Sequence, residues 1–240
     1  MDAGSPTVAL SVVVPFFNEE AVAYGVIEEL AAELSALQRP WEAVLIDDGS
    51  TDHTHAELER AQKKWPGCRI IRFARNRGQG AALHEGIHAA RAPVIVTMDG
   101  DGQNTPSDIG ALSALLDRAD LVNGVRRDRH DSRLRRALSR LANRVRGGML
   151  NDGMSDAGCA LKAFRREVAG AFWPIPMLNP FMPALAAAAG FRVIEHPVGH
   201  RRRAGGRSKY GLRVMLWRPC LDLLAVWWLL RRHKAWRRGA

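Results

Sequence analysis

Two aspartates, Asp99 and Asp101, are the residues of this chain whose type and spacing most clearly suggest chemistry. They follow the mostly apolar run 94–98 and are separated and followed by glycine. Carboxylate oxygens are ligands that Mg²⁺ and Mn²⁺ prefer, and substrate phosphates commonly complete the shell of such ions. The alternative is a turn in which Asp and Gly serve only the backbone geometry. The spacing therefore indicates either a divalent-metal site or a glycine-rich turn.

A strand and a helix should hold this loop in place. Residues 94–98 are uncharged and mostly apolar, which is typical of a buried strand. After the loop, Thr105 offers an N-cap, Pro106 suits the first helical position and Asp108 places an acid at the third. The two carboxylates would then lie at the carboxyl end of a strand, where open α/β sheets bind their ligands.

The rest of the chain alternates apolar runs with amphipathic segments. Strands are expected at 10–15, 43–46, 69–73, 94–98, 121–124 and 192–198, with a short one after the turn that begins at 156. Helices are expected from Asn18, which could cap the first of them, at 53–65 and at 81–90. This alternation with short connections predicts a doubly wound, mainly parallel α/β sheet.

Polar clusters follow the expected strands, at 16–20, 47–52 and 75–80. In a parallel sheet these clusters face one crevice, which favours a nucleotide-type ligand. Within the second cluster, Asp47 is expected to bond the backbone amides of its own turn. Gly78-Gln79-Gly80 does not complete a dinucleotide-binding GxGxxG, and the chain has no P-loop motif.

Charge is distributed unevenly along the 240 residues. Residues 1–125 carry 10 Lys and Arg against 18 Asp and Glu, a net charge of −8, whereas residues 126–240 carry 25 against 7, a net charge of +18. The second half should therefore meet anions: nucleic acid, an anionic membrane or phosphorylated substrates. A non-catalytic nucleic-acid or membrane-binding protein is a remote alternative, because no recognition-helix, RNP or aromatic-stacking pattern occurs among the arginines and this reading gives the Asp99–Asp101 loop no role.

The segment 212–230 is strongly apolar but is interrupted by charges and a proline, and five cations follow it in 231–238. Its longest uncharged run, 223–230, is far shorter than the ~20 residues that span a bilayer. An in-plane helix on an anionic leaflet is expected, and a helix packed on the protein or on a second subunit is the alternative. The three scattered cysteines predict no disulfide framework.

Several motifs in this order resemble those of family-two inverting glycosyltransferases, most closely the dolichol-phosphate mannose synthase-like branch. They run from about residue 8 to 210 and comprise VVVPFFNEE (12–20), IDDGSTD (46–52), NRG (76–78), MDGDGQNTP (98–106), GVR (124–126), SRLAN (139–143), DAGC (156–159), FRREV (164–168) and RAGGRSKY (203–210). The resemblance implies a nucleotide-diphospho-sugar transferase (GT-A, Rossmann-like) fold with a mixed, mainly parallel sheet and a basic C-terminal amphipathic helical extension. It implies a catalytic domain at 1–210, with a nucleotide-sugar half (1–125) and an acceptor half (126–210), and a membrane-interface or oligomerisation helix at 211–240.

The resemblance also assigns site residues. Those implied to hold the base and ribose of the donor are Pro15, Phe17, Glu19, Ile46 and Asp48. Those implied to hold the diphosphate through Mg²⁺ or Mn²⁺ are Asp99, Gly100, Asp101 and Gln103, with Asp99, Asp101 and Gln103 as metal ligands. Those implied to receive the acceptor phosphate or close over it are Arg126, Arg135, Ser139, Arg203 and Lys209, and Arg127, Arg133 or Arg136 could replace Arg135.

The implied reaction moves a hexose from GDP-mannose or a UDP-sugar to a polyprenyl phosphate, with inversion, on the cytoplasmic face of the inner (plasma) membrane, where the protein would be peripheral and a possible homo-oligomer. A phosphate monoester is mostly dianionic at neutral pH and is already a nucleophile, which fits an arginine-rich acceptor half without a His–Asp or Cys–His pair. The rival enzyme is a family-two transferase acting on a saccharide or lipid A hydroxyl. That acceptor needs a general base, for which Asp156 or Glu195 would be the candidates.

Overall fold

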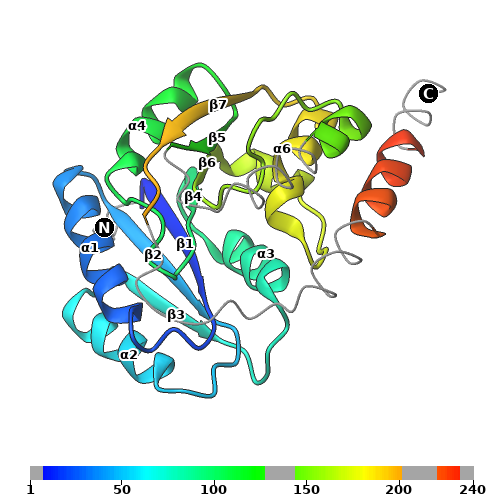
Figure 1. Ribbon diagram of the computed structural model, residues 1–240. Helices are drawn as coiled ribbons and strands as arrows, with labels where there is room; N and C mark the ends of the chain where they lie inside the picture. The colour runs from blue at the N-terminus through cyan, green and yellow to red at the C-terminus, as the bar shows by residue number, and fades with distance from the viewer. Residues whose placement is uncertain (1–7, 128–143, 202–220, 233–240) are drawn as a thin grey trace, which may run out of the picture.

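A seven-stranded mixed sheet forms the centre of the protein, in the order β3-β2-β1-β4-β6-β5-β7. The computed structural model (Figure 1) describes residues 8–127, 144–201 and 221–232. The strands are β1 Leu10–Phe16, β2 Trp41–Asp47, β3 Cys68–Arg72, β4 Val94–Thr97, β5 Leu121–Arg126, β6 Lys162–Arg165 and β7 Val193–Val198. Only β6 runs antiparallel to its neighbours, β4 and β5. The mixed, mainly parallel sheet expected from the sequence is therefore confirmed.

Proline is tolerated in the central strand β1 because of where the next strand ends. The pairing of β1 with β4 stops at Val13 and Thr97. The Val13 carbonyl accepts the N–H of Met98 at 3.0 Å, on the β4 side of the strand. Backbone groups two residues apart in a strand point to the same side, so the Pro15 nitrogen also faces this side, but beyond the last residue of β4. The N–H that proline lacks is not required there.

Helices cover both faces of the sheet, and each face has its own hydrophobic core. On one face lie α1 Ala23–Ala36, α2 Thr54–Lys64 and α4 Asp108–Ala114, and on the other lie α3 Gln79–Ala89 and α6 Leu178–Ala189. Two short 3₁₀ helices, η1 Leu115–Asp117 and η2 Arg166–Ala171, complete the named elements. Most apolar side chains of β1 and β2 alternate between the two cores, as the strand period of two requires.

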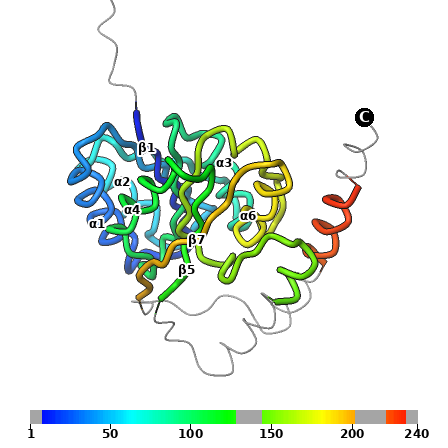
Figure 2. The backbone as a smooth tube through the Cα atoms, turned by 90° about the horizontal axis from the view of Figure 1, so that it is seen from above, coloured from blue at the N-terminus to red at the C-terminus, as the bar shows by residue number. Residues whose placement is uncertain are grey.

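Residues 221–232 form a helix that packs against the α3–α6 side of the molecule (Figure 2). Its Val226 and Leu230 are buried, whereas Leu221, Leu224 and Trp228 are 61%, 53% and 51% exposed. The helix therefore packs on the protein with one side and presents apolar side chains on another. No helix in the described ranges is long and apolar enough to cross a membrane.

Two helix starts differ from the expectation. Asn18 has a left-handed φ of 52°, and its Oδ1 accepts the N–H of Thr51 at 2.8 Å, so it bonds the loop after β2 and does not cap α1, which begins at Ala23. Helix α4 begins at Asp108, later than the Thr105 cap predicts. The Asp108 carboxylate instead accepts the N–H of Gly199 at 2.7 Å, in the segment after β7.

The two cysteines in the described residues form no disulfide, as the sequence predicts for them. Cys68 and Cys159 are both free and buried. Cys220 lies outside the described residues.

Candidate active site

The carboxyl ends of the parallel strands meet at one edge of the sheet. There β1 ends at Phe16, β2 at Asp47 and β4 at Thr97. The antiparallel strand β6 begins at the same edge with Lys162, which is paired with Thr97 on one side and Asn123 on the other. The polar segments that follow these strands are therefore gathered along one edge, as the sequence predicts.

The loop between β4 and α4 carries Asp99 and Asp101. The Asp99 N–H donates to Asn104 Oδ1 at 3.0 Å, and the Gln103 N–H donates to Asp101 Oδ1 at 3.0 Å. Gln79, at the start of α3, donates from Nε2 to Asp99 Oδ1 at 2.6 Å. Within the described part of the chain, neither carboxylate accepts a hydrogen bond at its Oδ2. Each therefore keeps an oxygen available to a ligand.

The electrostatics of this loop suit a cation. Burial raises the pKa of Asp99 to about 6, and the neighbouring Asp101 carboxylate acts in the same direction, against the attraction of Lys162 and Arg126. Among the described residues, no three His, Cys, Asp or Glu side chains are grouped to hold a metal. Mg²⁺ sites often use only one or two carboxylates, with waters and substrate phosphates as the other ligands. The donor set present here fits a divalent cation of that kind.

Gln103 connects this loop to the segment that follows β7. Its carbonyl accepts the Arg201 N–H at 2.9 Å, and its Nε2 lies 3.4 Å from the Arg201 carbonyl. Asn104 and His200 form an antiparallel bridge beside them. Because the Gln103 amide donates through nitrogen, its oxygen, the atom that could bind a metal, is not used by this contact. The chain after β7 therefore runs directly along the Asp99–Asp101 loop.

Asp48, one of the residues implied to bind the sugar donor, organises the loop after β3 through its carboxylate. It accepts hydrogen bonds from the N–H of Arg77 (2.7 Å), the N–H of Gly78 (2.9 Å) and Nδ2 of Asn76 (2.9 Å). Burial raises the pKa of Asp48, although these amide bonds favour its ionised form. Asp47 is fully buried and accepts the N–H of Ser50 at 2.9 Å, which confirms the expected role in its own turn.

The other implied donor residues differ in accessibility. Pro15, Phe17 and Glu19 are partly exposed at the end of β1, and the Glu19 N–H donates to Thr54 Oγ1 at 2.8 Å. Ile46 is fully buried in the α3-side core, so its side chain packs there and only its backbone borders the site.

Gly100 allows a close approach between the Asp99–Asp101 loop and the end of β1. A Cβ at this position would lie 2.5 Å from Phe16 Cδ1 and 2.8 Å from the Pro15 carbonyl oxygen. Only glycine allows this contact, which brings the Asp99–Asp101 loop directly against the end of β1.

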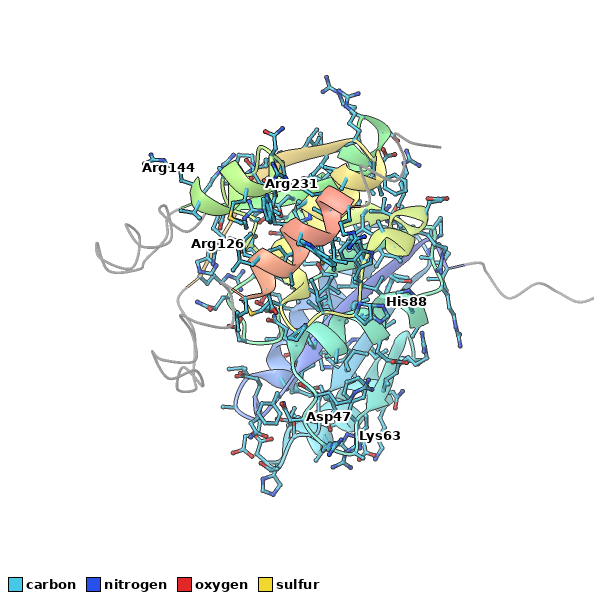
Figure 3. All side chains as sticks on the ribbon, turned by 90° about the vertical axis from the view of Figure 1, so that its right-hand side faces the viewer. Asp47, Lys63, His88, Arg126, Arg144 and Arg231 are labelled. Atoms are coloured by element: carbon cyan, nitrogen blue, oxygen red, sulfur yellow. The ribbon has the colours of Figure 1, made fainter. Side chains whose placement is uncertain are left out.

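Arg126, which is implied to bind the acceptor phosphate, forms a bidentate pair with Asp156. The distances are 2.8 Å from Nε to Oδ2 and 2.7 Å from Nη2 to Oδ1, and the Arg126 N–H also donates to Oδ2 at 3.2 Å. The Asp156 side chain is buried, and that of Arg126 is 19% exposed. Such a pair fixes the plane of the guanidinium. Figure 3 places Arg126 in the half of the molecule that carries helix 221–232 and Asp47 in the other half.

The other residues implied to bind the acceptor fall mostly in segments outside the described ranges. Arg135, Ser139, Arg203 and Lys209 lie outside the described residues, as do Arg133 and Arg136, whereas the alternative Arg127 follows β5 directly. Their roles stay predictions.

Lys162 is the residue at this edge that the sequence reasoning missed. It is fully buried. Its ammonium donates to the Ala157 carbonyl at 3.1 Å, to Asn179 Oδ1 at 2.8 Å and to the Cys159 carbonyl. Burial lowers its pKa to about 8, against the attraction of Cys159, Asp156 and Asp99, so it remains mostly protonated at neutral pH. The sequence feature that could have identified Lys162 is its position as the single charge within the apolar run 159–164.

Asp156 and Glu195, the two candidate general bases for a hydroxyl acceptor, already hold other groups. Asp156 pairs with Arg126, and Glu195 accepts hydrogen bonds from both the N–H and the hydroxyl of Ser155 at 2.8 Å. A general base must accept a proton from its substrate. A carboxylate that already pairs with an arginine or accepts several hydrogen bonds is poorly suited to that role.

Two curated proteins are similar in sequence to most of this chain. The chain is 38% identical over 228 residues to the dodecaprenyl-phosphate galacturonate synthase of Rhizobium johnstonii, covering 92% of this chain and 67% of that protein. It is 36% identical over 210 residues to the undecaprenyl-phosphate 4-deoxy-4-formamido-L-arabinose transferase of Edwardsiella ictaluri, covering 86% of this chain and 64% of that protein. The chain thus spans about two thirds of the length of these curated relatives.

Among solved structures, the fold is similar to that of glucosyl-3-phosphoglycerate synthase from Mycobacterium tuberculosis in complex with Mn²⁺, UDP and glucosyl-3-phosphoglycerate. The TM-score is 0.66 at 20% sequence identity, and the similarity covers 92% of this chain and 80% of that one. The GT-A fold expected from the sequence is therefore confirmed. Residues 11–173 match the family described as Glycosyl transferase family 2, and the chain belongs to that family.

Proposed function

We propose that this protein transfers a sugar from a nucleotide-diphosphate sugar to a polyprenyl phosphate. The observation that carries the proposal is that two polar groups lie at one edge of the sheet: the Asp99–Asp101 loop after β4 and the pair of Asp156 with Arg126, the last residue of β5. One group suits a metal-bound diphosphate and the other a phosphate. Two relatives that share over a third of their aligned residues with this chain are named as transferases or synthases acting on polyprenyl phosphates.

On the donor side, Asp99 and Asp101 would hold Mg²⁺ or Mn²⁺, with the Gln103 amide oxygen as a third ligand. When bound, such an ion acts as a Lewis acid that stabilises the charge that develops on a departing diphosphate. Similarity to a structure that contains Mn²⁺ and UDP supports this assignment. Pro15, Phe17, Glu19 and the backbone at Ile46 would border the nucleotide, and Asp48 would shape the 76–78 loop beside it.

On the acceptor side, Arg126 would bind the phosphate and fix its line of attack. The Asp156 carboxylate holds the guanidinium in one orientation, so little rotational freedom is lost when a phosphate arrives. The acceptor oxygen is already anionic and needs no base, and a single displacement would invert the anomeric centre. The engagement of Asp156 and Glu195 favours this acceptor over a saccharide hydroxyl.

A polyprenyl acceptor requires access to a membrane, and helix 221–232 offers a suitable surface. Four of the five large hydrophobic side chains that are exposed in the described residues lie on it: Leu221, Leu224, Trp228 and Leu229. Arg231 and Arg232 lie over the rings of Trp227 and Trp228, at 4.6 and 5.1 Å from the ring centroids. Aromatic and aliphatic side chains beside arginines are typical of helices that lie on anionic leaflets.

The proposed reaction can be tested directly. Purified protein would be incubated with labelled UDP- and GDP-sugars, Mn²⁺ or Mg²⁺, and polyprenyl phosphate in detergent. We expect label to enter the lipid, and we expect none to do so with EDTA, with polyprenol in place of its phosphate, or with Asp101→Asn. Asp117→Asn, a change at an exposed aspartate in η1, is the matched control and should retain wild-type transfer. Failure of folded wild-type protein to label polyprenyl phosphate from any donor would refute the proposal.

The membrane surface has its own test. Leu224→Ser and Trp228→Ser should each weaken sedimentation with anionic vesicles and leave the Tm nearly unchanged, because both side chains are about half exposed. Val226→Ala, at a buried position of the same helix, should lower the Tm and spare vesicle binding. If the two exposed substitutions leave vesicle binding intact, this helix is not the membrane contact.

A further inference from the structure

The proposed function leaves Lys162 without a role, although it is a fully buried cation at the centre of the site edge. A buried charge is costly unless it is hydrogen-bonded and paired, so its position requires an explanation. An ammonium group has three donors, and here three acceptors meet it: the carbonyls of Ala157 and Cys159 and Oδ1 of Asn179. All of its donors are therefore used within the protein, so it has none to offer a substrate.

The segment bound by Lys162 is the turn 156–161, and every carbonyl in that turn accepts a hydrogen bond. The donors are Asn123 Nδ2 and the Cys159 N–H to Asp156, Lys162 to Ala157 and Cys159, Asn179 Nδ2 to Gly158, Thr97 Oγ1 to Ala160, and the Gly124 N–H to Leu161. A change in the conformation of this turn would break some of these bonds and leave backbone carbonyls unpaired, which is costly where they are buried. Lys162 supplies two of these bonds and so connects the turn to β6 and, through Asn179, to α6.

The turn in turn sets the position of Arg126. Asp156 is its first residue, and the Asp156 carboxylate holds the Arg126 guanidinium through Nε and Nη2. On the other side of the turn, Glu195 accepts the N–H of Ser155 and of Asp156, at 2.8 and 3.2 Å. A shift of the turn would therefore move the carboxylate and the guanidinium together.

We propose that Lys162 is a positioning residue for the acceptor phosphate, which acts through the 156–161 turn and Asp156 to place the Arg126 guanidinium. The inference rests on the proposed function, because it takes the acceptor to be a phosphate bound at Arg126. It distinguishes Lys162 from a catalytic residue, which would touch a substrate. It also predicts an effect on the acceptor half of the reaction and not on binding of the nucleotide.

The test compares Lys162→Met with wild-type protein in steady-state transfer assays. We expect the KM for polyprenyl phosphate to rise by roughly 10- to 100-fold, the loss that a misplacement of about 1 Å can cause. The KM for the nucleotide sugar should change by less than about threefold. Lys162→Arg, which keeps a charge and several donors, should restore part of the acceptor affinity. An unchanged acceptor KM, or a rise confined to the nucleotide sugar, would overturn the inference.

A buried substitution can act by loosening the whole protein, so a matched control is needed. Arg166, just after β6, also bonds two backbone carbonyls, those of Ala90 and Ala92, at 2.7 and 3.0 Å. We expect Arg166→Met to lower the Tm and leave the acceptor KM within about twofold. In an Arg126→Ala background, Lys162→Met should add little to the acceptor KM, because the two residues act in series. Additive effects in that cycle would contradict the inference.

Two measurements keep the test decisive if Lys162→Met does not fold or if the proposed reaction fails. Asn179→Ala removes one acceptor of Lys162 and should raise the acceptor KM in the same direction, by a smaller factor. Amide hydrogen exchange requires no substrate: Lys162→Arg and Asn179→Ala should speed exchange in 155–161 and 124–127 and leave 99–104 unchanged. If wild-type protein transfers no sugar to polyprenyl phosphate, the proposed function fails; if exchange in these segments is unchanged, the positioning role fails by itself.

Discussion

Replacement of Asp99 by asparagine should stabilise the metal-free protein even though it removes a ligand of the proposed metal. Burial and the adjacent Asp101 carboxylate both disfavour the charge on Asp99 and raise its pKa from 3.8 to about 6. Asparagine has nearly the same shape, and its amide oxygen can still accept the hydrogen bond that Gln79 donates. The substitution therefore removes an unfavourable charge and retains the local contact.

The size of this stabilisation and its dependence on pH follow from the pKa of Asp99. At about 1.4 kcal/mol per pH unit, the difference between 3.8 and about 6 corresponds to at most about 3 kcal/mol. Because Asp99 is partly exposed to solvent, we expect about 1–2 kcal/mol, or roughly 2–8 °C in Tm. Between pH 3.8 and 6 the native state binds more protons at this site than the unfolded state, so wild-type stability falls as pH rises. The advantage of Asp99→Asn should accordingly open across this window and stay constant above it.

Urea and thermal unfolding in EDTA at pH 4, 5, 6 and 7.5 would measure this advantage. Asp52→Asn is a control of opposite sign: burial opposes ionisation there, but the hydroxyl and N–H of Thr54 donate to the carboxylate and lower the pKa of Asp52. That variant should lose stability above about pH 4 and recover as the pH falls. Addition of Mn²⁺ should stabilise wild-type protein and not Asp99→Asn. If Asp99→Asn were less stable than wild type at pH 7.5 in EDTA, or if its advantage did not vary with pH, the electrostatic reasoning would be wrong.

Three further outcomes are expected. Asp156→Asn leaves Arg126 without its ionised partner and should raise the KM for polyprenyl phosphate about tenfold and lower stability by about 1–3 kcal/mol, measured by transfer assays and urea unfolding. Gly49→Ala should destabilise the protein by about 2–4 kcal/mol in urea unfolding, because φ is +68° and a Cβ would lie 2.3 Å from the Arg75 carbonyl carbon. UDP with Mn²⁺ at about 100 times its Kd should stabilise the protein by about 2.7 kcal/mol in thermal-shift measurements, and removal of the metal by EDTA should abolish most of that gain.

The sequence was sufficient to predict the order of the strands and the first three helices, but it did not predict helix α6 (Leu178–Ala189), which contains Pro183, a residue that usually disfavours a helix interior. The strand at Val94–Thr97 and the helix at Gln79–Ala89 both begin and end within two residues of the expectation. Helix α4 begins two residues after its expected first position, Pro106, and its Asp108 side chain bonds Gly199, far away in the chain. Local patterns carry no information about such long-range hydrogen bonds.

The same limit applies to the site. Asp99 and Asp101 could be identified because their loop follows a strand, and a parallel sheet places all such loops at one edge. Lys162 could not, because its importance depends on β6 entering between β4 and β5 in the antiparallel direction. That insertion brings the amino-terminal end of β6 to the edge where the other strands end. A lone lysine in an apolar run indicates a buried charge but does not indicate its partners.

The two halves of the site differ in how their charges are balanced, and this difference should be visible in stability as well as in activity. On the acceptor side, the Asp156 carboxylate is matched by Arg126, and Lys162 is satisfied by the acceptors of its own surroundings. On the donor side, Asp99 and Asp101 repel each other, and a metal–nucleotide complex would relieve that repulsion. Neutralising a donor-side carboxylate should therefore stabilise the free protein and abolish binding, whereas neutralising Asp156 should destabilise the protein and only weaken binding. If Asp99→Asn raises the free energy of unfolding and Asp156→Asn lowers it, the difference would be difficult to explain by carboxylates that serve only to shape turns.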